Sequence, residues 1–125
     1  MLKNTLIVVN DVDAAVKFYR DVFYLFVISS SEEGAVLTNG LVVQDKKVWE
    51  QHLGRKVIPE NNASLLYFEE QNLSELLERL QRLYGPVEYV TPLTRLPWGD
   101  NLVRFYDPDG NLIEVREHDA REYAR

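Results

Sequence analysis

The chain contains no cysteine among its 125 residues. Disulfide bonds, a thiolate nucleophile and cysteine ligands for zinc are therefore excluded. The sequence also lacks any apolar run near the roughly 20 residues that cross a bilayer, and its first residues show no signal-peptide pattern. We therefore expect a cytoplasmic protein with no membrane partner.

Positive charge and histidine are also scarce. Lysine and arginine together number 14 against 20 acidic residues, which gives a net charge of -6 at pH 7. Because nucleic-acid binding requires a basic surface that neutralises phosphates, we expect no nucleic-acid partner. The two histidines, His52 and His118, lie outside the expected strands, and we expect both to face solvent. The sequence shows no glycine-rich phosphate loop, nucleophile elbow or Ser/His/Asp set.

The same pattern occurs twice along the chain. A β-rich run at residues 4–9 precedes a helix cap at Asp11 and an apolar stripe of helical spacing, and residues 65–68 and Asn72 begin a second such segment. Three further β-rich runs follow each helix: residues 24–29, 33–38 and 41–45 in the first half, and 87–93, 101–106 and 111–117 in the second. Each half therefore has the order β-α-β-β-β.

This repeat predicts an α+β fold with two paired βαβββ modules in a single domain over residues 1–125. Module 1 covers about residues 1–53, module 2 covers about 60–117, and residues 118–125 form a charged tail. We expect a cupped mixed sheet with the helices outside. Strand alternation assigns these side chains to the inner face: Asn4, Leu6, Val8, Val42, Gln44, Leu65, Tyr67, Glu69, Leu102, Arg104, Tyr106, Leu112, Glu114 and Arg116.

One carboxylate stands out on the last expected strand. A turn of Pro, Asp and Gly at residues 107–110 leads into it, and Glu114 lies there among apolar neighbours. Such a carboxylate is a metal ligand, a general acid or base, or one half of an ion pair. Arg104 and Arg116 are the candidate partners for the ion pair, and the sequence leaves these alternatives open.

The chain resembles the vicinal oxygen chelate superfamily, which includes glyoxalase I, bleomycin-resistance proteins and extradiol dioxygenases. Four stretches carry the resemblance: Val-Asn-Asp-Val-Asp-Ala-Ala-Val-Lys-Phe-Tyr at residues 9–19, Leu-Tyr-Phe-Glu-Glu at 66–70, Pro-Trp-Gly at 97–99 and Arg-Phe-Tyr-Asp-Pro-Asp-Gly-Asn-Leu-Ile-Glu-Val at 104–115. The resemblance implies two paired βαβββ modules around a cup, and it implies a homodimer.

The resemblance also implies four positions that could hold a divalent metal such as Zn, Ni, Mn or Fe in the cup. These positions carry Asn4, Gln44, Leu65 and Glu114 in this chain. Leu65 cannot coordinate a metal, and stable sites use about three or four donors. We therefore expect no resident cofactor, with a divalent metal held by Gln44, Glu114 and Asn4 as the alternative.

Three functions remain open from the sequence. The first is a glyoxalase/bleomycin-resistance-like protein that binds a small organic molecule through Gln44, Tyr67, Trp98, Arg104 and Tyr106, with a degenerate metal site. The second is a divalent-metal-dependent lyase, isomerase or dioxygenase of the same superfamily, with Glu114 as the catalytic residue. The third is an interaction module whose cup is filled by its own side chains.

Overall fold

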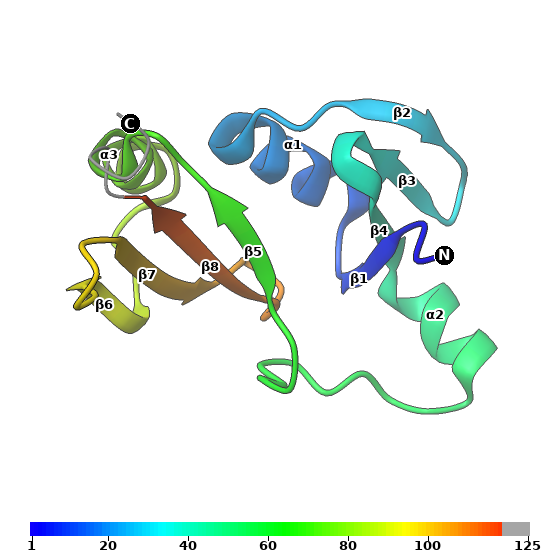
Figure 1. Cartoon of the computed structure of the whole chain (residues 1–125). Coiled ribbons are helices and arrows are strands. Elements are labelled where there is room, and N and C mark those ends of the chain that lie inside the picture. The colour runs from blue at the N-terminus through cyan, green and yellow to red at the C-terminus, as the bar shows by residue number, and fades with distance from the viewer. Residues whose placement is uncertain (119–125) are drawn as a thin grey trace. The chain divides into compact units, whose positions relative to one another are not determined.

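The computed structural model describes residues 1–118 of the chain (Figure 1). Contacts divide the chain into two compact units, with the boundary between Pro59 and Glu60. Each unit has its own four-stranded sheet and is described by itself below. The charged tail predicted for residues 118–125 lies, apart from His118, outside the described residues.

The first unit follows the predicted order and adds a helix at its end. Its elements are β1 (Thr5–Val9), α1 (Val12–Phe23), β2 (Val27–Ser30), β3 (Gly34–Leu37), the short turn η1 (Thr38–Gly40), β4 (Leu41–Asp45) and α2 (Lys46–Leu53). The strand order is β1-β4-β3-β2, with β1 and β4 parallel and the other pairs antiparallel. The turn predicted between β3 and β4 is confirmed, because Asn39 and Gly40 both adopt positive φ there.

The second unit repeats this arrangement. Its elements are β5 (Leu66–Glu69), α3 (Leu73–Tyr84), β6 (Tyr89–Arg95), β7 (Asn101–Tyr106) and β8 (Leu112–Glu117). The strand order is β5-β8-β7-β6, again with one parallel pair, β5 and β8. The α+β class and the two βαβββ units are therefore confirmed, while the joining of both sheets into one cup stays a prediction.

Local capping explains where α1 and α3 begin. The Asp11 carboxylate accepts a hydrogen bond from the backbone of the third residue of α1, at 3.1 Å. The side chain of Asn72 accepts one from Glu75 N–H at 3.1 Å. Glu117 of β8 also accepts a bond from Leu73 N–H, at 2.8 Å. This last bond ties the first turn of α3 to the end of the central strand pair of its unit.

The first helix ends on a residue that is rare in that position. Tyr24 has φ 57° and ψ 34°, the left-handed conformation in which glycine is common. Its N–H donates to Arg20 O, and Leu25 N–H donates to Tyr19 O. These turns delay the next strand, so the prediction that a strand begins at residue 24 is wrong, and β2 begins at Val27 instead.

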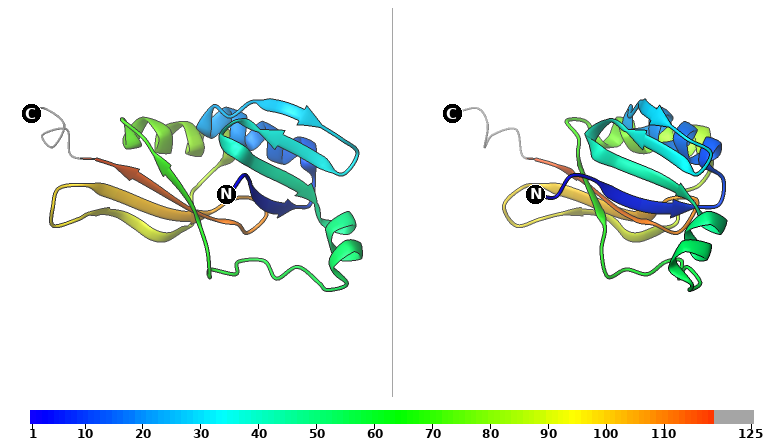
Figure 2. Two further views of the ribbon diagram at one scale, coloured as in Figure 1. Left: turned by 45° about the vertical axis from the view of Figure 1, so that its right-hand side comes forward. Right: turned by 90° about the vertical axis from the view of Figure 1, so that its right-hand side faces the viewer.

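Each sheet has one face that packs under a helix and one that does not. α1 packs against β3 and β4, and α3 packs against β8 (Figure 2). The side chains facing α3 include Val103, Phe105, Ile113 and Val115, all at most 2% exposed. Alternation places Arg104, Glu114 and Arg116 on the opposite face of that sheet, called the open face below. No helix among residues 1–118 is long and apolar enough to cross a membrane.

Candidate functional site

The open face of the second sheet carries an ion-pair cluster at its centre. Strand register places Tyr67 of β5, Glu114 of β8, Arg104 of β7 and Thr91 of β6 in one row across four strands. Arg104 Nε donates to Glu114 Oε1 at 2.7 Å, and its Nη1 donates to Thr91 Oγ1 at 3.2 Å. We call Arg104, Glu114 and Arg116 the guanidinium cluster.

Arg116 completes this cluster from the same strand as the carboxylate. Its Nη2 donates to Glu114 Oε2 at 3.1 Å, and its guanidinium carbon lies 5.3 Å from the centre of the Tyr67 ring. Each oxygen of Glu114 therefore faces a different arginine. The Glu114 side chain is 5% exposed, against 33% for Arg104 and 21% for Arg116. The structure thus shows the ion pair that the sequence left as one alternative for Glu114.

Tyr67 and Leu65 provide apolar surface beside the cluster. Tyr67 lies on the open face and Leu65 directly precedes β5, and they are 46% and 40% exposed. Burial raises the pKa of the Tyr67 hydroxyl, and the negative charges of Glu69 and Glu114 raise it further against the opposing effect of Arg116. Tyr67 is therefore a neutral phenol near pH 7, with its ring partly covered by a guanidinium and partly free.

A tight turn between β7 and β8 fixes the position of Glu114 opposite Arg104. Asp107 is 4% exposed, and its Oδ1 accepts hydrogen bonds from the backbone N–H groups of Asp109 and Asn111, both at 2.9 Å. Gly110 adopts φ 84° in the same turn. The Pro, Asp and Gly motif therefore sets the register that brings the carboxylate to the guanidinium.

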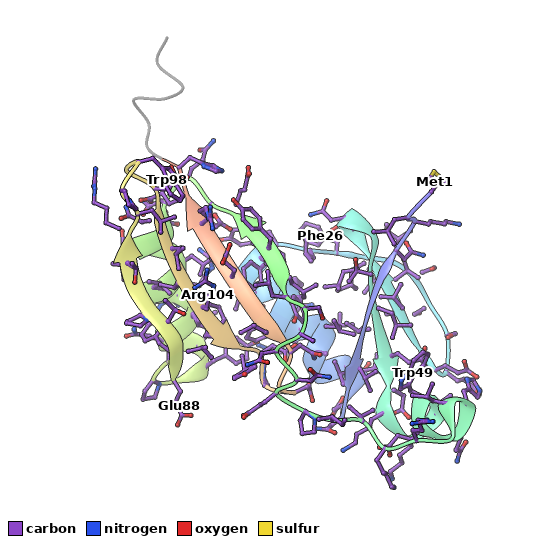
Figure 3. The ribbon with its side chains drawn as sticks, turned by 60° about the horizontal axis from the view of Figure 1, so that its bottom comes forward. Met1, Phe26, Trp49, Glu88, Trp98 and Arg104 are labelled. Atoms are coloured by element: carbon purple, nitrogen blue, oxygen red, sulfur yellow. The ribbon has the colours of Figure 1, made fainter. Side chains whose placement is uncertain are left out.

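The two other predicted ligand-binding aromatics lie at opposite ends of the second sheet. Tyr106 is paired with Leu112, one open-face position from Arg104, and its hydroxyl donates to Glu60 O at 3.4 Å. Trp98 lies in the turn between β6 and β7, is 54% exposed and donates from Nε1 to Asp100 at 3.0 Å. Figure 3 shows Arg104 near the middle of this sheet and Trp98 at its far end. The structure therefore brings Tyr67 and Arg104 together, and Trp98 lies apart from them.

Beyond that end lies a titratable cluster that the sequence did not reveal. His118 Nδ1 lies 3.1 Å from Asp100 Oδ2, and its Nε2 lies 2.9 Å from Glu69 Oε1. Hydrogen bonding to Glu69, followed by the interactions with Asp100, raises the pKa of His118 against the effect of burial. The prediction that His118 faces solvent is wrong, since only 23% of its side chain is exposed. Its partners are 18 and 49 residues away, so no local pattern marks them.

Gln44 lies on the face of the first sheet away from α1. It pairs with Val8 and Gly34 and borders a hollow of about 160 Å³ together with residues of β2 and β3. Its Nε2 is buried and has no hydrogen-bond partner. A Cβ at Gly34 would lie 2.1 Å from the carbonyl oxygen of Val43, so only glycine fits there. The glycine therefore lets β3 approach the backbone of β4 closely beside Gln44.

The two units differ in the connection between the first strand and the helix. Gln44 is opposite Val8, and Glu114 is opposite Tyr67. The N-cap of α1 follows Val8 by three positions, whereas the N-cap of α3 follows Tyr67 by five. The second connection is therefore two residues longer. Aligning the two units by their helix N-caps therefore pairs different residues of β1 and β5 than aligning them by strand register does.

This difference matters for the metal ligands that the resemblance implies. Asn4 precedes β1 by one residue and lies four positions before the level of Gln44, about 13 Å along the strand at 3.3 Å per residue. By sheet register, Leu6 is the counterpart of Leu65, which lies two positions before the level of Glu114. Both units therefore have a leucine, which cannot coordinate a metal, at this ligand position: Leu6 in the first unit and Leu65 in the second.

Neither unit by itself fits a divalent ion. In the second unit the Glu114 carboxylate is already held by two guanidinium groups, and a metal there would add positive charge beside them. Within residues 1–118 no group of three His, Asp or Glu side chains could hold a metal. The ligand set of Asn4, Gln44 and Glu114 stays a prediction, and the contacts within each unit do not supply the three or four donors that it requires.

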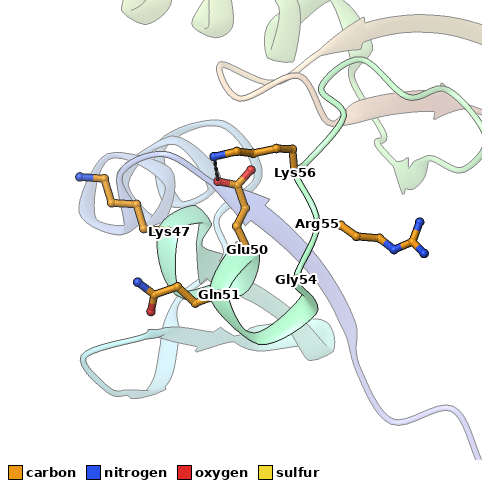
Figure 4. Close-up of a pocket in the computed structure, with 6 residues that line it drawn as sticks. All are labelled: Lys47, Glu50, Gln51, Gly54, Arg55 and Lys56. Carbon is orange, nitrogen blue, oxygen red and sulfur yellow. Dashed lines mark ion pairs between the residues drawn. The ribbon is translucent and has the colours of Figure 1, made fainter.

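A larger hollow of about 390 Å³ lies beside α2, but its side chains do not converge on a ligand. It is bordered by Lys47, Glu50, Arg55 and Lys56, among others. Figure 4 shows Lys47 and Arg55 extending away from the central Glu50. Glu50 is occupied by Lys56 at 3.7 Å and by Val57 N–H at 2.8 Å. We therefore place the candidate site on the open face of the second sheet.

The fold, the turn before β8 and the position of Glu114 agree with a known family. The family model described as a glyoxalase-like domain matches residues 2–118. The chain belongs to the glyoxalase-like domain family. This confirms the resemblance to the vicinal oxygen chelate superfamily. No curated protein matches the chain.

Several solved structures are similar to this chain. A protein of unknown function from Agrobacterium tumefaciens str. C58 is 27% identical, with a TM-score of 0.77 and coverage of 95% of this chain and 94% of that one. Lactoylglutathione lyase from Agrobacterium tumefaciens is 26% identical, with a TM-score of 0.66 and coverage of 94% and 92%. A glyoxalase-related enzyme from Fulvimarina pelagi shares the fold at 19% identity, with a TM-score of 0.74 and coverage of 94% and 88%.

Proposed function

We propose that this glyoxalase-like chain binds a small organic molecule on the open face of its second sheet. The guanidinium cluster carries the proposal: Arg104 and Arg116 remain partly exposed there, although both contact Glu114. Tyr67 and Leu65 add exposed apolar surface next to these polar groups. Ligand sites combine apolar walls with a few fixed polar groups in this way. The ligand would lie against Tyr67 and Arg104.

A titration of the full chain tests this proposal. A panel of aromatic acids and amphiphilic antibiotics is measured by calorimetry against the wild type, Arg104→Gln and Arg82→Gln. Arg82 is the matched control, because it lies on α3 with 62% of its side chain exposed. We expect at least one saturable ligand whose affinity falls with Arg104→Gln and stays unchanged with Arg82→Gln. Saturable binding that is indifferent to Arg104, or no binding across the panel, would reject the site.

A divalent-metal-dependent lyase, isomerase or dioxygenase is the second candidate function. The similarity to lactoylglutathione lyase favours it, since that structure is 26% identical over 94% of this chain. A metal would supply Lewis-acid stabilisation of developing negative charge. Gln44 and Glu114 are the donors this candidate would use, with Glu114 as the catalytic residue, and Glu114 would first have to leave Arg104 or Arg116.

Metal analysis separates the two candidates. Protein purified without chelator is assayed for Zn, Ni, Mn and Fe, alongside Glu114→Ala and, as the control, Glu78→Ala on α3. A stoichiometric metal that is lost only with Glu114→Ala would establish the second candidate. Metal content well below one ion per chain, with ligand binding retained, would support the first.

The remaining expectations from the sequence also stay predictions. A homodimer is checked by light scattering of the full chain, and a cytoplasmic location is checked by fractionation of cells that express it. If the open face is filled by partner contacts instead of a ligand, the panel titration will show no binding while light scattering shows a complex.

A further inference from the structure

We infer that the ligand of the open face is an organic monoanion, a carboxylate attached to a flat apolar body, bound by the exposed edges of Arg104 and Arg116. This inference rests on the proposed function, because it names the chemical class of the molecule bound at that site. Neither the glyoxalase-like fold nor the similar structures specify this chemistry. Three features of the second sheet support the inference: the charge of the two arginines, their hydrogen-bond donors and the exposed apolar residues beside them.

The charges of the guanidinium cluster do not balance. Two guanidinium groups, permanently charged, share the single carboxylate of Glu114. Thr91, the other side chain in contact with Arg104, is neutral. Within these three residues one positive charge is therefore left over on a partly buried surface, where its interaction with an anion is stronger than in bulk water. A monoanion would neutralise that charge, whereas a dianion would add a surplus negative charge beside Glu114.

The hydrogen bonds of the arginines are also incompletely used. Each guanidinium carries several N–H donors in a planar fork that suits a carboxylate. Arg104 uses Nε and Nη1, Arg116 uses Nη2 for Glu114, and Arg116 Nε is buried without a partner. The remaining donors on the exposed edges point to an oxygen-bearing anion.

The nearby acidic groups lie toward the His118 end of the sheet. Glu69 and Asp100 are the other carboxylates close to Tyr67, and both contact His118 at the end of the sheet. Two carboxylates there face one imidazole, so this end of the sheet keeps a surplus negative charge, and Glu69 is opposite Arg116 in the strand register. Because Glu69 is itself 64% exposed, it disfavours an anion placed toward that end. The carboxylate of the ligand is therefore expected on the Arg104 side of the row.

The apolar body of the ligand would lie on β5. Leu65 directly precedes β5 and Tyr67 lies on it, and these residues are 40% and 46% exposed. The Tyr67 ring contacts Arg116 and so continues the surface of the guanidinium cluster. An aromatic ring attached to the carboxylate can contact Tyr67 while its oxygens reach Arg104.

Benzoate, benzamide and acetate are the probes that test this inference. Nitrogen-15-labelled full-length protein is titrated with each probe, and the Nε–H signals of Arg104 and Arg116 are followed by NMR. We expect benzoate to shift both signals saturably and to bind at least tenfold more tightly than benzamide or acetate. Affinity for benzoate should fall at least tenfold with Arg104→Gln, should change less than twofold with Arg82→Gln, and should decrease as salt is raised.

The outcomes separate failure of the anion inference from failure of the proposed binding function. Equal binding of benzamide and benzoate at the arginines would overturn the anion inference and leave the proposed binding function standing. Benzoate shifts that persist unchanged in Arg104→Gln would place the probe elsewhere and also overturn the inference. No saturable shift with any probe would overturn the inference alone, provided that the wider panel finds a ligand that depends on Arg104. If Arg104→Gln does not fold, Arg104→Lys keeps the charge but loses the fork, and an unchanged affinity in that variant would contradict the geometry.

Discussion

Replacing Glu114 by glutamine should cost more stability than replacing either arginine that contacts it. The substitution leaves two guanidinium groups on one partly buried surface with no carboxylate between them. Removing one partner of a buried ion pair costs about 3–5 kcal/mol, whereas exposed pairs contribute about 0–1 kcal/mol. Glu114 is 5% exposed but its partners are 33% and 21% exposed, so we expect about 2–3 kcal/mol.

Replacing either arginine should reduce stability less, because the remaining arginine and Glu114 still form a pair with no net charge. Arg104→Gln removes the 2.7 Å contact with the carboxylate, yet Arg116 still neutralises Glu114. We expect a loss of about 1 kcal/mol from this variant. The double variant with Glu114→Gln should cost less than the sum of the single variants, with a coupling of about 1–2 kcal/mol.

Urea unfolding followed by tryptophan fluorescence, to which Trp49 of the first unit and Trp98 of the second both contribute, and by circular dichroism measures these differences. Glu78→Gln on α3 is the matched control, since that carboxylate is 75% exposed and should contribute less than about 0.5 kcal/mol. If Glu114→Gln were as stable as the wild type, or more stable than Arg104→Gln, the carboxylate would not serve to balance the arginines. The count of charges behind the proposed ligand class would then be wrong.

Three further predictions concern other parts of the chain. Tyr24→Gly should raise the free energy of unfolding by about 1 kcal/mol, since glycine adopts the left-handed conformation without the Cβ penalty; an unchanged urea midpoint would contradict this. Because hydrogen bonds raise the pKa of His118 above its ordinary 6.5, its stabilisation should be complete below that pH and be lost as pH rises through the folded-state pKa. His118→Gln should remove this pH dependence, and a persisting difference between pH 6 and pH 8 would assign it to other groups. Gly34→Ala should cost at least about 2 kcal/mol because its Cβ would clash with a backbone oxygen of β4. Gly54→Ala, with open space around it, should cost only about 1 kcal/mol, and equal losses by thermal unfolding would refute the clash.

The elements governed by local rules were predictable from the sequence. α1 and α3 begin directly after Asp11 and Asn72 because capping depends on a few neighbouring residues. The bounds of β4 and β7 were also predicted correctly. Alternation identified the face of the second sheet that packs under α3, since burial repeats every second residue along a strand.

The features that depend on pairing between distant segments were not predictable. The sequence offered Arg104 and Arg116 as alternative partners of Glu114, and only the folded structure shows that both contact it. His118 is held by residues from two other strands or turns, which no local pattern connects to it. The resemblance implied Asn4 as a metal position, whereas the register of β1 with β4 puts it four positions before the level of Gln44, and no local pattern reveals that register.

The longer connection between β5 and α3 limits how the two repeats can be recombined. Because the connection is longer by two residues, the side chains of the strand stay on the same faces of the sheet. The polar face and the apolar face are therefore not exchanged. A single added residue would invert that pattern along the whole segment unless a bulge absorbed it. Grafting one half of the chain onto the other should therefore tolerate length changes in steps of two, and a library of such chimaeras should recover folded members mainly with even offsets.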